Sequence, residues 1–321
     1  MIKPWIQAAR LRTLPLAISG VLLGWAIHLP FVSDETAKSQ SNGMVLLLAI
    51  FTAVCLQVLS NFANDYGDFQ KGTDQAAGRT DRAVSAGLIS PSQMKMALFI
   101  LSGLTFGIGL FMLNYCGVLQ SSEGKTLLTM GILSIAAAIF YTVGKNAYGY
   151  LGLGDIMVLI FFGLLPVAGM GVLLHVEWNL VTLLGGLAIG FLSTGVLNVN
   201  NYRDILSDES HGKKTLAVRL GASKTLIYHR LLMVFGGILF PISLVVLAHD
   251  VYNWISWKRL DLALVFGLFF PVYGLLNKHY LDVKSHQPGE REALNKQLKT
   301  LSLTSLLSVL IFVLIVLFFM A

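Results

Sequence analysis

Residues 43–74 read GMVLLLAIFTAVCLQVLSNFANDYGDFQKGTD, an apolar run that ends in a cluster of carboxylates and amides. The apolar part has the length of one membrane-spanning helix, which needs roughly 20 such residues. On a helix, Asn61, Asn64, Asp65 and Asp68 recur at steps of three, one and three, so they share one face. The stretch therefore predicts a membrane helix that presents an acidic stripe at one end.

The whole chain has the composition of a membrane protein. Of its 321 residues, 55% are hydrophobic and 12% are charged, and the mean hydropathy is +0.71. Soluble domains carry about 25% charged residues. The net charge of +6 does not indicate a nucleic-acid partner, because the basic residues are not grouped with aromatic ones. We therefore expect an all-α, polytopic protein of the lipid bilayer, with a single domain over residues 1–321.

Nine apolar runs are long enough to cross a bilayer, and we expect nine transmembrane helices around a central cavity. Pro166, Pro241 and Pro271 lie inside three of the runs and predict helix kinks. The runs cover approximately residues 14–30, 43–66, 93–115, 126–144, 153–175, 179–202, 226–248, 260–278 and 299–320.

The basic residues are distributed unequally between the two sides of the predicted bundle. All but four of the 23 lysine and arginine residues fall in the N-terminus and the even-numbered connections. The four exceptions are Lys38, Lys125, Lys258 and Arg259. By the positive-inside rule, the N-terminus and the even-numbered connections are cytoplasmic. Nine spans then leave the C-terminus outside the cell membrane, and long cytoplasmic connections at 67–92 and 203–225 cover the cavity.

A second acidic stretch, NVNNYRDILSDESHGKKTLAVRLG at residues 198–221, follows the sixth apolar run. Asn198, Asn201, Asp204 and Asp208 recur there at steps of three, three and four, again on one helical face. Two helices, four apart in order, are thus expected to present Asn and Asp side chains toward one cytoplasmic cavity.

Carboxylates that converge in one cavity repel each other, and a hard divalent cation relieves that repulsion. Mg²⁺ takes oxygen ligands and commonly shares its coordination shell with substrate phosphates. Basic residues beside both motifs are suited to the same diphosphate substrate. The candidates for diphosphate binding are Lys71, Arg79, Arg82, Arg203 and Lys213, with Lys214 as an alternative to Lys213. Acidic residues at a helix end can also be simply solvated, but two matched stripes with Asn partners favour a functional site.

These two motifs, NDYGDFQKGTD at 64–74 and NNYRDILSDESHGKKTLAVRLG at 200–221, resemble those of the UbiA superfamily of intramembrane prenyltransferases. The second motif is most similar to the 1,4-dihydroxy-2-naphthoate branch of that superfamily. Two further stretches agree, namely ARLRTLPLAISGVLLG at 9–24 and YTVGKNAYGYLGLGDIMVLIFFG at 141–163.

The resemblance implies a Mg²⁺-dependent transferase with two substrates. A polyprenyl diphosphate loses its diphosphate, and the allylic carbon alkylates an aromatic acid. In the naphthoate branch the ring carbon that carries the carboxylate is attacked, CO₂ leaves, and the product is a demethylmenaquinol. The positions that match the family's metal ligands are Asn64, Asp68, Asp204 and Asp208.

Three more residues are candidates for catalytic roles. Tyr141 lies where an aromatic face would stabilise an allylic cation, although an interfacial anchor is an equally good interpretation. Lys145 is positioned to bind the carboxylate of the aromatic acid, or it serves only as a topology charge. Asp65 borders the acidic stripe and is our candidate for accepting the proton of the ring hydroxyl.

Other functions remain open at the level of sequence. Within the same superfamily, 4-hydroxybenzoate or another acceptor is an alternative to the naphthoate. A divalent-cation transporter is a different class of protein, but its site would lie near the middle of the membrane. Both acidic stripes lie instead at the cytoplasmic helix ends, which favours the transferase.

Overall fold

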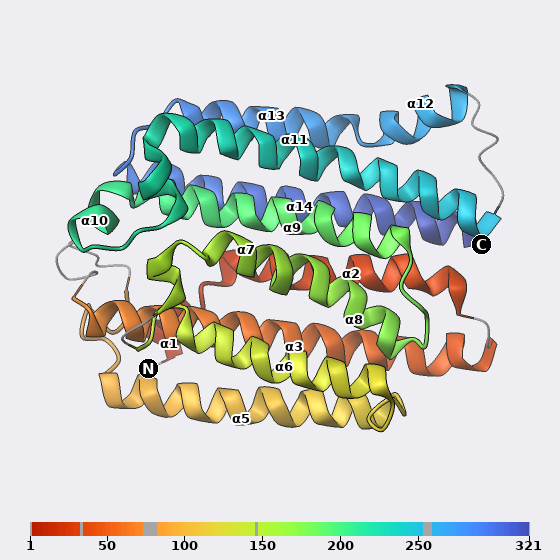
Figure 1. Ribbon diagram of the computed structural model, residues 1–321, viewed down its shortest axis with the longest axis horizontal. Coiled ribbons are helices and arrows are strands. Elements are labelled where there is room, and N and C mark those ends of the chain that lie inside the picture. The colour runs from red at the N-terminus through yellow and green to blue at the C-terminus, as the bar shows by residue number, and fades with distance from the viewer. Residues whose placement is uncertain (1, 33–34, 73–81, 145–146, 253–258, 321) are drawn as a thin grey trace.

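The computed structural model describes residues 2–32, 35–72, 82–144, 147–252 and 259–320. Regular structure in these ranges is helical throughout, without a strand. The long helices lie side by side along the long axis of the molecule (Figure 1). The predicted all-α fold is therefore confirmed.

The first part of the chain forms two long helices and two of intermediate length. The helix α5 begins at Pro91 because Ser90 Oγ accepts the Gln93 N–H while the Gln93 side chain returns to the Ser90 N–H. The elements in order are α1 (Ile2–Ala9), η1 (Leu11–Thr13), α2 (Leu14–His28), η2 (Leu29–Phe31), α3 (Glu35–Gln70), α5 (Pro91–Tyr115) and α6 (Ser122–Phe140).

The second part is built around the buried helix α9, which Asn179 and Thr182 start with a reciprocal cap of the same kind. The elements in order are η3 (Tyr148–Leu151), α7 (Gly154–Val158), the π-helical turn η4 (Leu159–Leu164), α8 (Leu165–Leu173), α9 (Leu180–Arg203), α10 (Ile205–Ser210), α11 (Leu216–Tyr252), α12 (Arg259–Leu268), α13 (Phe270–Lys284) and α14 (Arg291–Met320).

Eight helical segments in the described ranges have the length and apolar composition of a membrane span, so the chain is a multi-pass membrane protein. The expected ninth span at 260–278 is divided at Phe269 into α12 and α13, each too short to qualify alone. Pro271 explains the division, since it lacks an N–H for a continuous helix and is favoured in the first turn of a new one. The count of nine is thus not confirmed.

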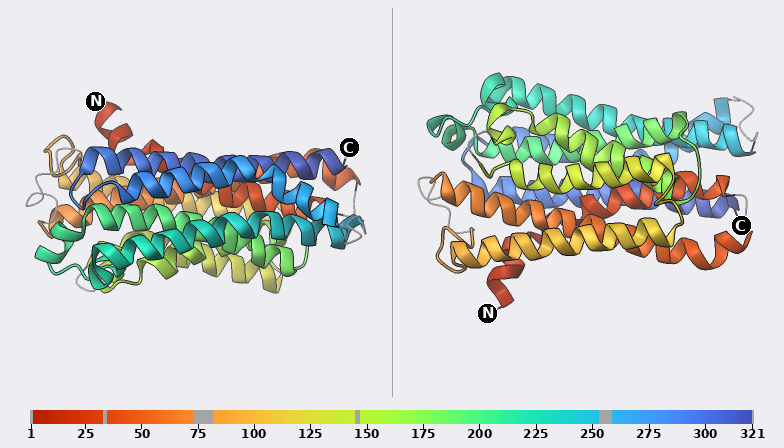
Figure 2. Two further views of the ribbon diagram at one scale, coloured as in Figure 1. Left: turned by 90° about the horizontal axis from the view of Figure 1, so that it is seen from above. Right: turned by 60° about the horizontal axis from the view of Figure 1, so that its bottom comes forward.

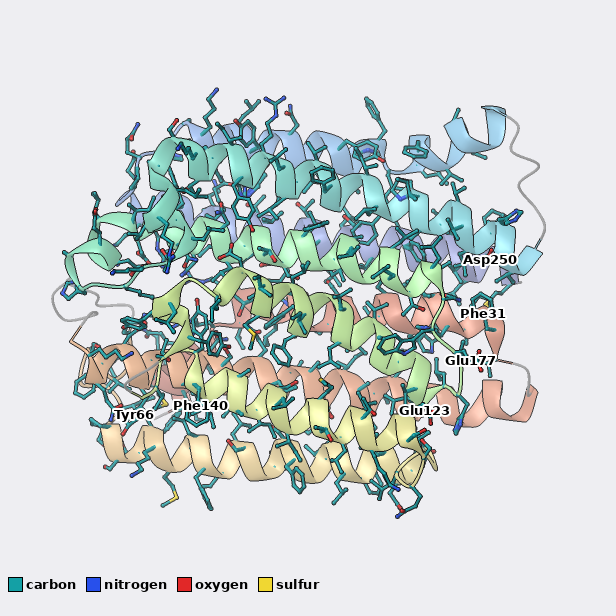
Figure 3. All side chains as sticks on the ribbon, in the orientation of Figure 1. Phe31, Tyr66, Glu123, Phe140, Glu177 and Asp250 are labelled. Carbon is teal, nitrogen blue, oxygen red and sulfur yellow. The ribbon has the colours of Figure 1, made fainter. Side chains whose placement is uncertain are left out.

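The two acidic motifs lie at the same end of the bundle. The C-terminal end of α3, the end of α9 and the short helix α10 gather at one end, which we call the motif end (left in Figure 1). Glu123, Glu177 and Asp250 lie toward the other end (Figure 3). The N-terminus lies at the motif end, where α1 projects from the bundle, and the C-terminus lies at the opposite end (Figures 1 and 2). The helices α12 and α13 together return the chain to the motif end before α14 begins.

Glycines set the distance between α9 and the π-helical turn η4. A Cβ atom on Gly163 would lie 2.5 Å from both the Gly186 carbonyl oxygen and the Gly190 Cα. The backbones of η4 and α9 are therefore in direct contact, as is common between membrane helices with small residues at the interface. This contact holds η4 and α9 together as neighbouring parts of the wall of the cavity described below.

We expect Gly163→Ala to lower the free energy of unfolding in detergent by about 1–3 kcal/mol, and with it the unfolding midpoint, because the added methyl group forces two backbones apart. Gly103→Ala on α5 is the matched control, since a Cβ there meets nothing within 4 Å. The measurement is the unfolding midpoint of each purified variant. Equal midpoints for the two variants would contradict the close contact.

Candidate active site

A cavity of about 320 Å³ lies among α2, α3, α5, α6, η4, α8 and α9. Aliphatic and aromatic side chains form most of its wall, down to Leu173 near the end of α8. Its polar lining includes Arg10, Asn64, Tyr141 and Asn200. Asn64 and Asn200 each lie one helical turn before an aspartate of the two acidic motifs, so the apolar cavity leads toward both motifs.

The first motif is buried at the end of α3. Asp68 is 5% exposed, and its Oδ1 accepts a hydrogen bond from the Tyr150 hydroxyl at 3.2 Å. Its Oδ2 lies 3.7 Å from Arg82 Nη2, which neutralises its charge. Asp65 Oδ2 accepts the Ala83 N–H at 3.0 Å and so fixes the segment that carries Arg82. The connection after the first motif thus supplies its counter-charge.

Gly67 explains how the end of α6 reaches this motif. A Cβ on Gly67 would lie 2.7 Å from Thr142 Oγ1, and that hydroxyl donates to the Ala63 carbonyl at 2.8 Å. The missing side chain therefore lets the residues after α6 pack directly on α3, which brings Tyr141 to the cavity.

The second motif lies where α9 ends and α10 begins. Asp204 accepts from Arg203 Nε at 3.0 Å, and Arg291 Nη1 lies 3.9 Å from its Oδ1. Asp208 Oδ1 lies 3.6 Å from Lys213 Nζ, and the Lys213 N–H donates to the Asp208 carbonyl at 2.9 Å. Each aspartate of the motif is therefore buried against a cation.

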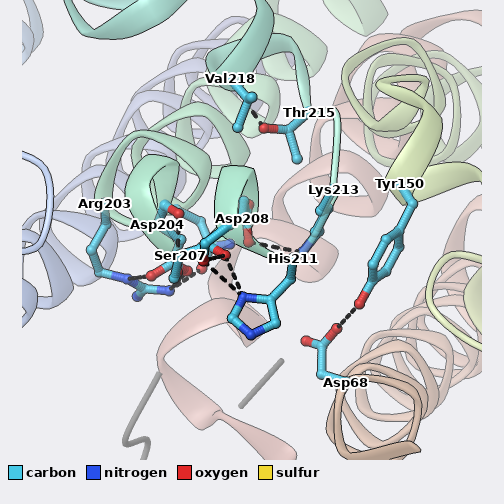
Figure 4. A network of polar contacts seen from close by, with 12 residues as sticks. Asp68, Tyr150, Arg203, Asp204, Ser207, Asp208, His211, Lys213, Thr215 and Val218 are labelled. Atoms are coloured by element: carbon cyan, nitrogen blue, oxygen red, sulfur yellow. Dashed lines mark hydrogen bonds and ion pairs between the residues drawn. The ribbon is translucent and has the colours of Figure 1, made fainter. Parts of the chain in front are cut away.

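Lys213 lies between Asp208 of its own motif and Asp68 of the first motif (Figure 4). Burial alone lowers the pKa of Lys213, but the carboxylates of Asp68 and Asp208 outweigh this effect and raise its pKa above the usual value. The side chain therefore stays protonated at neutral pH. Burial lowers the pKa of Lys71, whose Nζ is 3.6 Å from the centroid of the Tyr150 ring, while Asp68 opposes that shift.

The predicted asparagine stripe on α9 is displaced. Asn198 and Asn201 are buried but are not part of the cavity wall, which Asn200 lines instead. In addition, α9 ends at Arg203, and Asp204 has φ −100° and ψ 6°, so the two aspartates do not continue the face of α9. The prediction from helical spacing was of one straight helix through both the Asn and the Asp residues.

The remaining predicted residues divide into three groups. Tyr141 lines the cavity, and its ring contacts that of Tyr148 with centroids 5.3 Å apart. Arg203 is bound to Asp204 and also donates to Asn200 Oδ1 at 2.9 Å. Arg79 and Lys145 lie outside the described residues.

Three residues that contribute to the site were not predicted. Tyr150 contacts Asp68 and lies beneath two lysines, and its segment was noted only as part of the stretch YTVGKNAYGYLGLGD. Arg291 and Asn295, at the start of α14, contact Asp204 and Arg203 respectively. A single sequence gives no signal for these last two, because they are 87 and 92 positions away from the residues that they contact.

The donor set suits a hard divalent cation such as Mg²⁺. Carboxylate and amide oxygens dominate both motifs, and Asn64 Oδ1 is buried with no hydrogen-bond partner among the described residues. Within the same part of the chain, no three His, Cys, Asp or Glu side chains gather as a metal-binding group. Two motifs with few ligands each are appropriate for Mg²⁺, which keeps waters and shares its shell with substrate phosphates.

Two bacterial proteins are similar to this chain over most of its length. The 1,4-dihydroxy-2-naphthoate octaprenyltransferase of Haemophilus influenzae is 40% identical over 306 residues, covering 94% of this chain and 92% of that protein. The protein of the same name from Escherichia coli is 40% identical over 253 residues, covering 78% of this chain and 79% of that protein.

Solved structures of low identity share the fold. A UbiA homologue from Archaeoglobus fulgidus bound to GPP and Mg²⁺ matches with a TM-score of 0.61 at 14% identity, over 98% of this chain and 99% of that one. The apo structure of a UbiA homologue from Aeropyrum pernix gives a TM-score of 0.60 at 14% identity, over 95% and 98%. The sequence model of the UbiA prenyltransferase family matches residues 31–294 of this chain. The chain belongs to the UbiA prenyltransferase family.

Proposed function

We propose that this protein transfers a polyprenyl group from a polyprenyl diphosphate to 1,4-dihydroxy-2-naphthoate, with loss of CO₂ and diphosphate, to give a demethylmenaquinol. The observation that carries the proposal is the position of Lys213 between the buried Asp68 and Asp208, next to an apolar cavity. An anionic head group with a long apolar tail is the kind of substrate that this combination accepts.

The relatives support the choice of acceptor. Proteins 36–40% identical to this chain carry the name 1,4-dihydroxy-2-naphthoate octaprenyltransferase in four bacteria. The structures of the Archaeoglobus homologue contain GPP or DMAPP together with Mg²⁺, which supports a prenyl diphosphate and a divalent metal as ligands of the family.

The cationic side chains of the site bind the diphosphate in this proposal. Lys71, Arg82 and Lys213 surround Asp68, so an arriving diphosphate meets donors already held in place. Donors fixed before the reaction stabilise the negative charge that develops on the leaving group without reorganisation. Mg²⁺, held by Asn64, Asp68, Asp204 and Asp208, would supply further neutralisation of that charge.

The cavity protects the allylic carbon once the bond to the diphosphate weakens. Its largely aliphatic and aromatic wall excludes water, which would otherwise capture the carbon. Tyr141 and Asn64 both line this cavity, and the ring face of Tyr141 provides a negative quadrupole for the developing cation. The acceptor ring would approach from the same polar end of the cavity.

The aromatic acid needs a cation for its carboxylate and an acceptor for its hydroxyl proton. We assign the binding of the carboxylate to Lys145, as the sequence predicts. We assign the acceptance of the hydroxyl proton to Asp65, whose Oδ1 is buried with no hydrogen-bond partner among the described residues. Asp65 does not line the cavity, and its Oδ2 fixes the Arg82 segment, so its role as a base stays a prediction.

The motif end of the bundle is cytoplasmic in this proposal, and the membrane is the cell membrane. The unequal distribution of basic residues supports this orientation. The N-terminus is then cytoplasmic and the C-terminus external, since the two lie at opposite ends of the bundle (Figure 1).

Substitution of one aspartate in either acidic motif tests the diphosphate site. We expect Asp68→Asn and Asp208→Asn each to reduce prenyl transfer by at least about 100-fold, because each removes a charge that positions metal and leaving group. Asp250→Asn, an exposed aspartate toward the opposite end, is the matched control and should keep full activity. Turnover should stop in excess chelator and return with Mg²⁺. Full activity of either site variant would refute the assignment.

The identity of the acceptor is tested by the fate of its carboxylate. With 1,4-dihydroxy-2-naphthoate labelled with carbon-14 in that group, we expect gaseous label to appear in step with prenylated product. Label retained in the product, or faster turnover of 4-hydroxybenzoate, would assign the protein to another acceptor within the family.

A topology reporter tests the orientation. A reporter fused after Ala321 should respond as an external one, and a reporter inserted in the connection 73–81 should respond as a cytoplasmic one. The reason is that basic side chains concentrate at the motif end. Both reporters on one side of the membrane would contradict an odd number of crossings.

A further inference from the structure

We propose that Tyr150 is a positioning residue that joins the two acidic motifs into a single diphosphate site. The inference rests on the proposed function and assigns a role to a residue outside both motifs. Tyr150 belongs to the short helix η3, between α6 and α7, and three of its parts make three separate contacts. The main chain contacts the second motif, the hydroxyl contacts the first, and the ring lies beneath lysines from both.

The main chain of η3 is fixed to the second motif. The Lys214 N–H donates to the Tyr150 carbonyl at 3.1 Å, and Arg219 Nη2 donates to the Leu151 carbonyl at 3.0 Å. The next turn needs Gly152, which has φ 78° and on which a Cβ would lie 2.8 Å from the Lys214 carbonyl oxygen. Tyr150 therefore moves together with the segment that carries Lys213.

The Tyr150 hydroxyl reaches across to the first motif and donates to Asp68 Oδ1 at 3.2 Å (Figure 4). A hydrogen bond to a carboxylate is stronger than one between neutral groups, and it fixes the orientation of the carboxylate plane. Asp68 Oδ2 is thereby turned toward Arg82. Asp68 is thus oriented by a residue whose own backbone is held by the second motif.

The Tyr150 ring holds two cations at the site. Lys71 Nζ, from the end of α3, is 3.6 Å from the ring centroid, and Lys213 Nζ is 5.3 Å from it. Two ammonium groups this close to one ring repel each other, and the ring quadrupole together with Asp68 offsets that repulsion. Both lysines are therefore kept where a diphosphate would need them before it binds.

The experiment separates the hydroxyl from the ring. The probe is inorganic diphosphate, and its binding to purified protein is measured by calorimetry at a series of Mg²⁺ concentrations. Tyr150→Phe removes the bond to Asp68 and keeps the ring, so we expect about 10-fold more Mg²⁺ to be needed for half-maximal binding. Tyr150→Leu also removes the ring, and we expect about 10-fold weaker diphosphate binding even at saturating Mg²⁺.

Tyr280 provides the matched control. Its ring holds a cation in the same way, with the Arg230 guanidinium 5.5 Å from the centroid, but it makes no contact with either motif among the described residues. Tyr280→Phe and Tyr280→Leu should bind diphosphate as the unaltered protein does. Unfolding midpoints of all four variants identify any loss that comes from misfolding, and Tyr150→Phe, which is nearly isosteric, decides the question if Tyr150→Leu does not fold.

The outcomes distinguish this inference from the proposed function. If the unaltered protein does not bind diphosphate with Mg²⁺, the proposed function fails. If it binds, and folded Tyr150 variants bind with unchanged Mg²⁺ requirement and affinity, the role of Tyr150 is refuted. A raised Mg²⁺ requirement in Tyr150→Phe, with a further loss of affinity in Tyr150→Leu, supports it.

Discussion

Compensation of buried negative charge is the constraint on which the rest of this structure depends. Asp68, Asp204 and Asp208 are each at most 6% exposed at one end of a membrane bundle. A carboxylate buried without a partner is strongly destabilising, so each needs a cation at close range. Arg82, Arg203 and Lys213 supply these cations. They come from the connection after α3, from the last residue of α9 and from the connection after α10, respectively.

The same constraint explains why the site lies at a helix end. Lysine and arginine are costly in the apolar interior of a bilayer, so the counter-charges must come from chain near the membrane surface. The carboxylates have to follow them there. Behind them, the glycine contacts of η4 with α9 and of α3 with Thr142 draw the helices together around an apolar cavity. The charged motif end and the apolar cavity behind it are thus consequences of one arrangement.

This arrangement also separates the two halves of the proposed chemistry. The diphosphate belongs with the cations at the motif end, and the prenyl chain and the reactive carbon belong in the water-excluding cavity. Asn64 and Asn200 lie at the boundary, one turn from Asp68 and Asp204. A cation that forms at this boundary has anionic groups on one side and aromatic faces on the other, which limits its capture by water.

The sequence by itself determined the helical membrane architecture, because apolar length and charge bias are local properties of the chain. It also determined Asn64, Asp68, Asp204 and Asp208 as the candidate ligands, since helical spacing and family resemblance both point to them. Tertiary structure decided the rest. The packing of α9 left Asn198 outside the cavity wall, and the end of α9 at Arg203 took Asp204 and Asp208 off its face. The division at Phe269 interrupted a run that hydropathy treats as continuous.

The partners of the motifs were likewise decided only by folding. Tyr150 lies 82 positions from Asp68, and Arg291 comes from the start of the last helix to reach Asp204. Such contacts depend on how helices pack and where loops return, which no local periodicity records. A motif shows which residue types the chemistry needs, whereas the neutralisation and orientation of those residues are properties of the assembled bundle.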